Sequence, residues 1–279
     1  MKKISRRSFL AAAGLSVAAL ALTACGGSSA STASSVASSA ASSEAASTSA
    51  AAGELTTVEA GKLTMATNAT FPPYEMTTDA GDIEGIDVET AQAIADKLGL
   101  ELQIDDMDFD AALLSVQQGK ADIVMAGVTV TDERKAVMDF SDSYATGIQS
   151  IIVPEGSDIA SPDDLAGKKI GTQRGTTGYI YCSDDFGDDA VVAYDNGLTA
   201  VQALNNGQVD AVVIDNAPAK EYVAANPGLA ILDTSYAEED YAIGMAKGSS
   251  LEDAVNAALE ELKADGTLQS IVDKYITAE

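Results

Sequence analysis

The sequence predicts an α/β protein made of two similar lobes. A helix, a glycine, an aspartate (Asp122, Asp210) and a short apolar strand follow one another twice, at residues 109–126 and again at residues 196–214. Short apolar strands that follow helices are typical of parallel sheets covered by helices. Some 225 residues lie beyond residue 53, which is enough for two compact lobes.

The other elements follow from hydrophobic periodicity and turn residues. Residues 63–67 form an apolar strand candidate, and the turn-forming Pro72 and Pro73 come after it. Apolar residues at helical spacing predict a helix at 88–98, which Gly99 can end in a left-handed conformation.

The C-terminal segment predicts two amphipathic helices, at residues 251–262 and 268–275, separated by Asp265-Gly266. Ser249 and Glu252 have the spacing of a capping box at the start of the first helix. We interpret both apolar faces as core.

The N-terminal segment predicts a lipoprotein export signal. Four basic residues precede an apolar run at 9–22, and roughly 14 residues are too few to span a bilayer. The following Leu22-Thr23-Ala24-Cys25 resembles the cleavage site of bacterial lipoproteins, in which the cysteine receives lipid and becomes the new N-terminus. We therefore expect residues 1–24 to be a signal peptide and Cys25 to be lipidated; an ordinary signal peptide with a chance cysteine is the alternative.

The route of export stays open. Residues 5–10, Ser-Arg-Arg-Ser-Phe-Leu, also resemble a twin-arginine motif, although Ala11 stands where a lysine is common. Residues 26–53 are almost wholly Ser, Ala, Thr and Gly. This composition offers too little apolar surface to fold, so we expect residues 25–53 to be a lipidated cysteine followed by a disordered tether.

Composition excludes several function classes. The net charge is −27, and removal of the signal would take four basic residues and no acidic one, which argues against nucleic acid as a partner. Histidine is absent, so imidazole-based triads and the usual catalytic zinc sites are excluded. Beyond Cys25 only Cys182 remains, and no intramolecular disulfide is expected. We expect no cofactor, no metal and no enzymatic activity.

A pair of opposite charges follows the two duplicated strands. Ligands bind beyond the carboxyl ends of strands in open parallel sheets, where Arg134 follows the first strand and Asp215 the second. Arginine holds a carboxylate through two parallel hydrogen bonds, and an aspartate accepts from an ammonium, so the pair matches a free amino acid. The alternatives are a solvated Arg134 in a helix capped by Thr131, and Asp215 as a turn residue.

Six motifs together resemble the polar amino-acid solute-binding proteins of ABC importers. The resemblance runs from about residue 55 to 275 with the motifs in order. They lie at residues 66–74 (ATNATFPPY), 85–89 (GIDVE), 127–134 (GVTVTDER), 139–141 (DFS), 175–178 (GTTG) and 210–215 (DAVVID).

The resemblance implies a periplasmic-binding-protein-like type II fold. Two Rossmann-like lobes, joined by a two-strand hinge, would enclose a ligand cleft. Lobe 1 would comprise residues 54–147 plus 244–279 and lobe 2 residues 148–243, with hinge crossings near 147–149 and 240–244. The protein would be a monomer that captures a free amino acid at the extracytoplasmic face of the membrane and delivers it to an ABC-importer permease.

The resemblance also implies the roles of individual residues. Arg134 would hold the α-carboxylate, and Asp215 would take the α-ammonium. Aromatic stacking would come from Phe71 and Phe109, and the neutral amide of Asn68 argues for a neutral polar ligand such as glutamine or cystine. The full set of expected ligand-binding residues is Asn68, Phe71, Phe109, Gly127, Val128, Thr129, Arg134, Gln173, Thr176, Thr177 and Asp215.

Two other functions stay open. A sensory module would pass the ligand state to a membrane receptor, and co-purification with a receptor or with a permease would separate the two cases. Dehydratases and lyases on the same fold would need an acid or base in the cleft, where Asp215 is the one carboxylate the sequence places. Turnover of candidate substrates would identify an enzyme.

Overall fold

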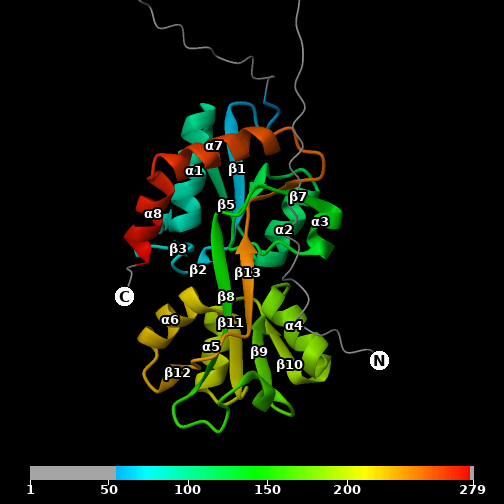
Figure 1. The fold of residues 1–279 in the computed structure, drawn as a ribbon, viewed down its shortest axis with the longest axis vertical. Coiled ribbons are helices and arrows are strands. Elements are labelled where there is room, and N and C mark those ends of the chain that lie inside the picture. The colour runs from blue at the N-terminus through cyan, green and yellow to red at the C-terminus, as the bar shows by residue number, and fades with distance from the viewer. Residues whose placement is uncertain (1–54, 277–279) are drawn as a thin grey trace, which may run out of the picture. The chain divides into compact units, whose positions relative to one another are not determined.

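The protein is described by a computed structural model over residues 55–276 (Figure 1). The predicted signal peptide, Cys25 and the tether lie outside these residues and stay predictions. Within residues 55–276, no helix combines the length and the apolar character needed to cross a bilayer. The helices in this range are α1 (Ile86–Leu98), α2 (Phe109–Gln117), α3 (Asp132–Val137), α4 (Thr177–Phe186), α5 (Gly197–Asn205), α6 (Asn216–Ala225), α7 (Glu252–Ala264) and α8 (Thr267–Tyr275).

The first lobe is built on a five-stranded sheet. Its strands lie in the order β5 (Glu101–Asp106), β1 (Lys62–Thr67), β6 (Ile123–Val124), β14 (Gly244–Ala246) and β7 (Met138–Phe140). β1 runs parallel to both neighbours, whereas β14 runs antiparallel to β6 and β7. One face of the sheet packs against α1, α7 and α8, and the other packs against α2.

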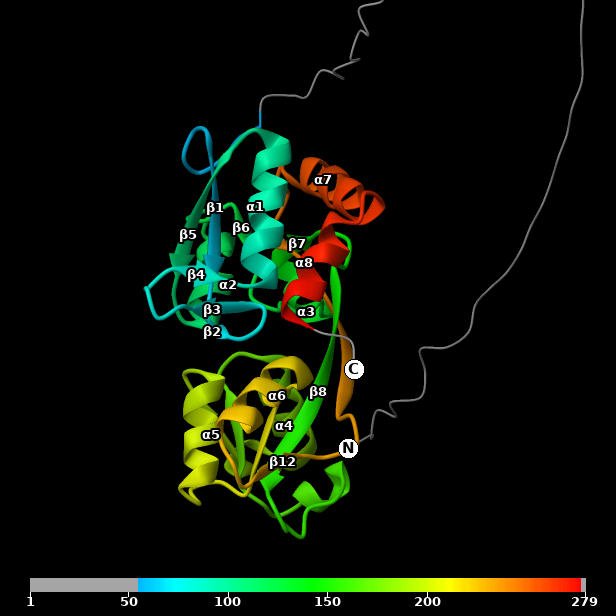
Figure 2. The same cartoon turned by 90° about the vertical axis from the view of Figure 1, so that its left-hand side faces the viewer.

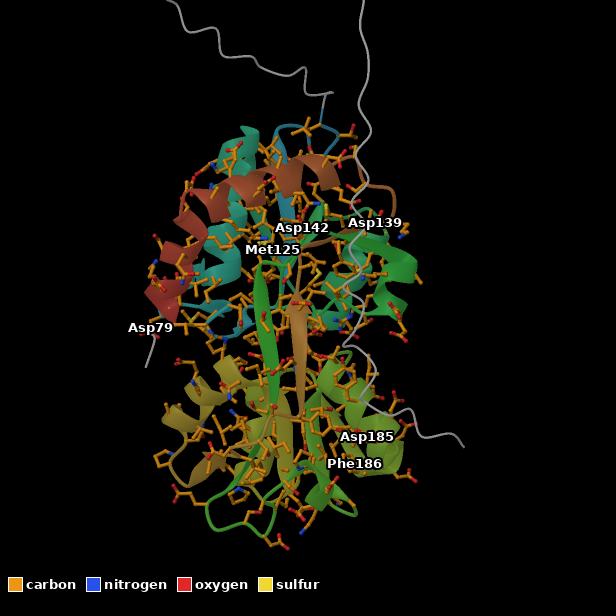
Figure 3. The ribbon with its side chains drawn as sticks, in the orientation of Figure 1. Asp79, Met125, Asp139, Asp142, Asp185 and Phe186 are labelled. Carbon is orange, nitrogen blue, oxygen red and sulfur yellow. The ribbon has the colours of Figure 1, made fainter. Side chains whose placement is uncertain are left out.

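The second lobe repeats this plan. Its strands lie in the order β10 (Val191–Tyr194), β9 (Ile170–Gln173), β11 (Ala211–Asp215), β8 (Ala145–Pro154) and β12 (Leu229–Ile231), and β13 (Ala237–Tyr241) also pairs with β8. α5 and α6 cover one face, while α4 covers the other and buries Cys182. Figure 3 labels Asp185 and Phe186 at the end of α4 in lobe 2, and Met125 in lobe 1, where its side chain is buried. The α/β fold of two similar lobes is therefore as predicted.

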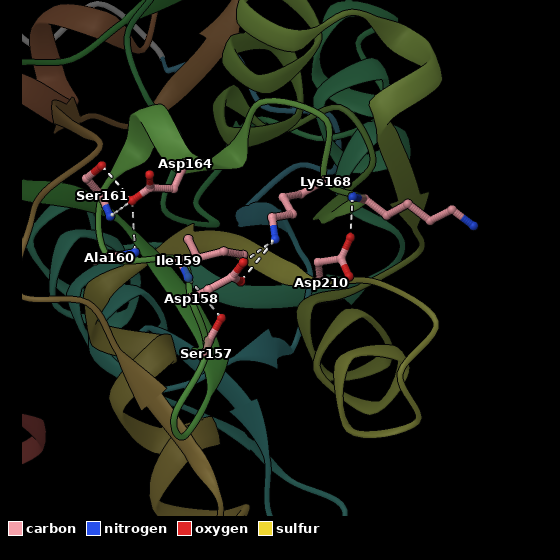
Figure 4. Close-up of polar contacts among 9 residues, drawn as sticks. Ser157, Asp158, Ile159, Ala160, Ser161, Asp164, Lys168 and Asp210 are labelled. Atoms are coloured by element: carbon pink, nitrogen blue, oxygen red, sulfur yellow. Dashed lines mark hydrogen bonds and ion pairs between the residues drawn. The ribbon is translucent and has the colours of Figure 1, made fainter.

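The two duplicated aspartates have the same structural role. Asp122 accepts a hydrogen bond from the backbone N–H of Thr64, near the start of strand β1, at 2.8 Å. Asp210 accepts from the N–H of Lys169, just before strand β9, at 2.7 Å (Figure 4). In each lobe a carboxylate thus satisfies a backbone donor that the sheet leaves unpaired.

β8 and β13 form the two-strand hinge between the sheets (Figures 1 and 2). They pair antiparallel from Ala145 opposite Tyr241 to Gln149 opposite Ala237. The return pairing therefore begins at Ala237, three residues before the expected 240–244. A Cβ on Gly147 would overlap the ring of Tyr241, so only glycine lets the two strands approach here.

A small antiparallel sheet belongs to the first lobe, with strands β2 (Thr70–Phe71), β3 (Glu75–Thr77) and β4 (Ile83–Glu84). Its register places Phe71 directly opposite Glu75. Phe71 and Glu75 are therefore neighbours on paired strands, although a turn separates them in the sequence.

The helix ends agree with the sequence in part. Gly99 ends α1 with φ of 70°, and Thr131 caps α3 by accepting from the N–H of Arg134, both as predicted. The capping box at α7 is wrong: Leu251 holds the N-cap position and makes no side-chain cap. The Ser249 hydroxyl accepts from the N–H of Leu251 instead, because the chain makes one more turn before the helix begins.

We propose the boundaries 54–147 plus 244–279 for lobe 1 and 148–243 for lobe 2.

Candidate functional site

A cavity lies between the two lobes and takes its lining from both. It contains about 440 Å³ of space not filled by atoms, part of it open to solvent. Every residue that we expected to bind ligand, apart from Val128, lines it. The lining residues are Asn68, Phe71, Glu75, Phe109, Ala126, Gly127, Thr129, Arg134, Gln149, Gln173, Thr176, Thr177, Val213, Ile214, Asp215 and Tyr241.

Val128 is placed elsewhere. Its side chain is fully buried in the core between α2 and the lobe 1 sheet. Consecutive residues in an extended segment point in opposite directions, and here Gly127 and Thr129 take the cavity side.

Arg134 reaches across the cavity from α3. Its guanidinium donates to the carbonyl of Thr129 in lobe 1 at 2.7 Å and to the carbonyl of Gly175 in lobe 2 at 3.1 Å. The ring of Phe109 lies 5.4 Å from its carbon Cζ, within the distance of a cation–π contact. Burial lowers the pKa of Arg134, and the nearby Glu239 carboxylate opposes that shift. The guanidinium stays charged, because such groups titrate far above neutral pH.

The N-terminus of α4 faces the same part of the cavity. Thr176 caps this helix by accepting from the N–H of Tyr179, and the Thr177 hydroxyl lies 3.4 Å from the hydroxyl of Thr129. Unpaired N–H groups and the helix dipole favour an anion at such an end. Arg134 and α4 together therefore form an anion-binding corner.

Asp215 lies at the end of β11 and is almost fully buried. Its two oxygens accept from the backbone N–H groups of Ile148 and Ala217, at 2.7 and 3.0 Å. Burial is the main cause that raises its pKa to about 6, against the lowering effect of these hydrogen bonds and of Tyr241. A cation beside Asp215 would offset the cost of burying the charged carboxylate, so this corner of the cavity suits an ammonium.

Aromatic rings close one side of the cavity. Phe71 stacks on Tyr74 with ring centroids 5.7 Å apart, and Tyr74 meets Tyr241 edge to face at 5.4 Å. Gly127 adopts φ of 56°, and a Cβ there would come within 2.7 Å of the Phe71 ring. Glycine is required at this position by both its backbone conformation and its neighbours.

Asn68 and Gln173 meet across the lobes. The Gln173 amide donates to the Asn68 side-chain oxygen at 2.9 Å, while the Asn68 amide donates to the carbonyl of Met107. The pair thus forms a neutral polar wall of the cavity.

Glu75 is the most consequential residue that the sequence reasoning missed. It is fully buried, lines the cavity, and neither carboxyl oxygen has a partner with full hydrogen-bond geometry. Burial and then the neighbouring Asp87 raise the pKa of Glu75 well above its usual value. The expectation that Asp215 is the one cleft carboxylate is therefore wrong. No sequence pattern indicated Glu75, because it reaches the cavity through the register of β2 and β3, which puts it opposite Phe71.

Asp87 is buried and makes hydrogen bonds that position the cavity lining. It accepts from the N–H of Gly127 at 2.9 Å and from the hydroxyl of Tyr144 at 2.7 Å. Burial raises its pKa to about 6. Asp87 thereby fixes the backbone of the loop that leads to Thr129.

Glu239 organises the hinge side of the cavity, and sequence reasoning missed it as well. One of its oxygens accepts from the Thr129 hydroxyl and from the Gln149 amide, both at 3.0 Å. It thus links β13, β8 and the lobe 1 loop at one point. Its sequence signal is weak, because Glu238 and Asp240 beside it are exposed carboxylates.

Comparisons with known proteins identify a family for this chain. The profile of the bacterial extracellular solute-binding proteins, family 3, matches residues 63–278. A probable histidine-binding protein of Neisseria gonorrhoeae is 34% identical over 96% of this chain and 95% of its own length. The L-cystine-binding protein TcyJ of Escherichia coli (strain K12) is 34% identical over 79% of this chain and 85% of its own. The solved structure of an ancestral arginine-binding protein bound to glutamine is 43% identical, with a TM-score of 0.75 over 78% of this chain and 99% of its own.

The raised pKa of Asp215 predicts how stability depends on pH. The folded state binds this proton more tightly than the unfolded state, whose pKa is near 3.8, so stability falls as pH rises from about 4 to about 6. A shift of two units corresponds to about 3 kcal/mol. Urea unfolding at pH 4, 5, 6 and 7 should show a shallower decline for Asp215→Asn than for the parent. Parallel curves would show that Asp215 does not contribute.

Proposed function

The chain belongs to the bacterial extracellular solute-binding proteins of family 3, and on this basis we propose that it captures a free amino acid and delivers it to an ABC-importer permease. The observation that carries the proposal is the pair of opposite charges in one cavity: Arg134 with the α4 N-terminus at one corner and Asp215 at another. A zwitterionic amino acid complements both corners at once.

The α-carboxylate lies against Arg134 in this proposal. Each terminal nitrogen of the Arg134 guanidinium donates one N–H to a backbone carbonyl. A guanidinium has five N–H donors, so three remain for a carboxylate. The N–H of Thr177, in the first turn of α4, adds a donor from lobe 2, whereas the N–H of Thr176 already donates to the Gln173 carbonyl. The α-ammonium then donates to Asp215, with the Gly127 carbonyl as a second acceptor.

Glu75 decides the class of side chain that we propose. Glu75 is a fully buried carboxyl that makes no hydrogen bond of full geometry and has the Asp87 carboxyl as its polar neighbour. Two neighbouring carboxyls close to the stacked ring of Phe71 suit a planar cation such as a guanidinium. We therefore favour arginine over the neutral ligands that Asn68 alone indicates. Relatives with this fold include proteins named for histidine, for cystine and for arginine, the last also seen with glutamine, so glutamine and cystine remain the alternatives.

Location and state complete the proposal. Lipidation at Cys25 would hold the protein at the extracytoplasmic face of the membrane, with residues 26–53 as a tether. We further propose that it acts as a monomer without cofactor and catalyses no reaction, since the cavity carboxyls Glu75 and Asp215 are assigned to binding. Ligand that contacts both lobes stabilises the closed arrangement, which the permease would recognise.

Amino-acid binding depends on Arg134. A thermal-shift panel of the twenty amino acids with cystine and ornithine should show a response from the parent, with about 2.7 kcal/mol of stabilisation at 100 times the dissociation constant. Arg134→Ala should weaken binding about 100-fold or more in calorimetry, since it leaves a buried carboxylate unpaired. Arg134→Lys should recover little, because lysine lacks the bidentate geometry. Unchanged affinity in Arg134→Ala would disprove the assignment.

Selectivity depends on Glu75. Glu75→Gln keeps the shape of the side chain but removes its charge, so arginine affinity should fall about 10- to 100-fold. Glutamine affinity should change only a few-fold, which makes glutamine the matched control ligand in calorimetry. An equal loss for both ligands would contradict the proposed guanidinium contact.

Anchoring depends on Cys25. The full chain expressed in a bacterium should partition into the detergent phase of a Triton X-114 extraction. Cys25→Ser should move the protein into the aqueous phase, because no thiol remains to receive lipid at the predicted cleavage site. Aqueous partition of the parent would contradict the lipoprotein assignment.

A further inference from the structure

The lobes also touch at a place outside the cavity. The hydroxyl of Tyr222, on α6 of lobe 2, donates to the backbone carbonyl of Thr70, on β2 of lobe 1, at 2.5 Å. Neither residue lines the cavity. Many hydrogen bonds join the lobes along the hinge, where residues 239–243 pair with lobe 1. Among the described residues away from the hinge, three other hydrogen bonds join the lobes, and each includes a residue of the lining: Asn68–Gln173, Thr129–Thr177 and Arg134–Gly175.

Tyr222 belongs to the core of lobe 2. Its side chain is 6% exposed and packs in the core that includes Ile214 and Leu229. Gly197 at the start of α5 makes room for it, since a Cβ there would lie 3.1 Å from the ring and 3.3 Å from the hydroxyl. Burial raises the pKa of Tyr222 further above neutral pH. The hydroxyl is thus a neutral, pre-positioned donor.

Thr70 is held equally firmly by lobe 1. Its N–H donates to the Asn68 carbonyl, and its register in the small sheet places it opposite Met76. The next residue, Phe71, packs against the cores of both lobes and lines the cavity. Contact between β2 and lobe 2 therefore also positions Phe71, which forms part of the cavity wall.

We propose that the Tyr222–Thr70 hydrogen bond is a latch that stabilises the closed arrangement of the lobes and sets ligand affinity without touching the ligand. The inference rests on the proposed function only in that an amino acid binds between the lobes. A contact made only in the closed state shifts the closure equilibrium for every ligand that requires closure, and by the same factor. The latch therefore contributes affinity but no selectivity.

The test is Tyr222→Phe, which keeps the buried ring and removes only the donor. When the lobes are open, water can hydrate the Thr70 carbonyl, but in the closed state of the variant that carbonyl loses its partner. The dissociation constants for L-arginine and L-glutamine should rise by the same factor, about five- to thirtyfold. Stopped-flow measurements should place the change mainly in the dissociation rate.

Tyr236→Phe is the matched control. Tyr236 is 5% exposed, and its hydroxyl donates to Asp185 at 2.7 Å within lobe 2. This variant loses a buried tyrosine hydroxyl whose acceptor, Asp185, belongs to the same lobe, so both dissociation constants should match those of the parent. Thermal unfolding of both variants checks that the lobes remain folded.

Two results would overturn the latch: unchanged dissociation constants in Tyr222→Phe, or a rise for one amino acid alone, which would indicate direct contact with that ligand. Small-angle scattering without added amino acid gives an independent measurement, and Tyr222→Phe should have the larger radius of gyration. If neither amino acid bound the parent, the proposed ligands would be wrong, and an unchanged radius of gyration would then count against the latch by itself.

Discussion

The buried positive charge of Arg134 is the constraint on which the site depends. A buried guanidinium is tolerated only when its donors are paired and its charge is balanced. Carbonyls at Thr129 and Gly175 satisfy donors from opposite lobes, and the Glu239 carboxylate balances charge from the hinge. Glu239 also fixes Thr129 through its hydroxyl. The cation therefore connects lobe 1, lobe 2 and the hinge.

Negative charge is concentrated in the same small volume. Glu75, Asp87 and Asp215 are all buried, and burial raises the pKa of each. Like charges in a low-dielectric site cannot all ionise cheaply, so an incoming cation lowers the cost of the charged form. In the function proposed above, these destabilised carboxyls therefore favour a ligand with more than one positive group.

The sequence predicted the duplicated helix and strand and some of the residues at which elements end. The duplicated helix and strand placed Arg134 and Asp215 at the strand ends, and Gly99 marked the end of α1 correctly. It did not reveal Glu75, because that residue depends on the pairing of two very short strands, which no periodicity announces. Val128 was wrongly grouped with its neighbours for a similar reason: one step along an extended segment reverses the direction of the side chain. Local pattern carries little information on such pairings and directions.

Tyr241 has a consequence for how the molecule moves. Its ring sits against Gly147 where β8 and β13 run side by side, and the same ring forms part of the cavity wall. The two strands are hydrogen-bonded into one ribbon, so any change in the angle between the lobes bends both of them. In the function proposed above, the ligand lies against the ring that packs on this ribbon, so ligand and hinge share one side chain.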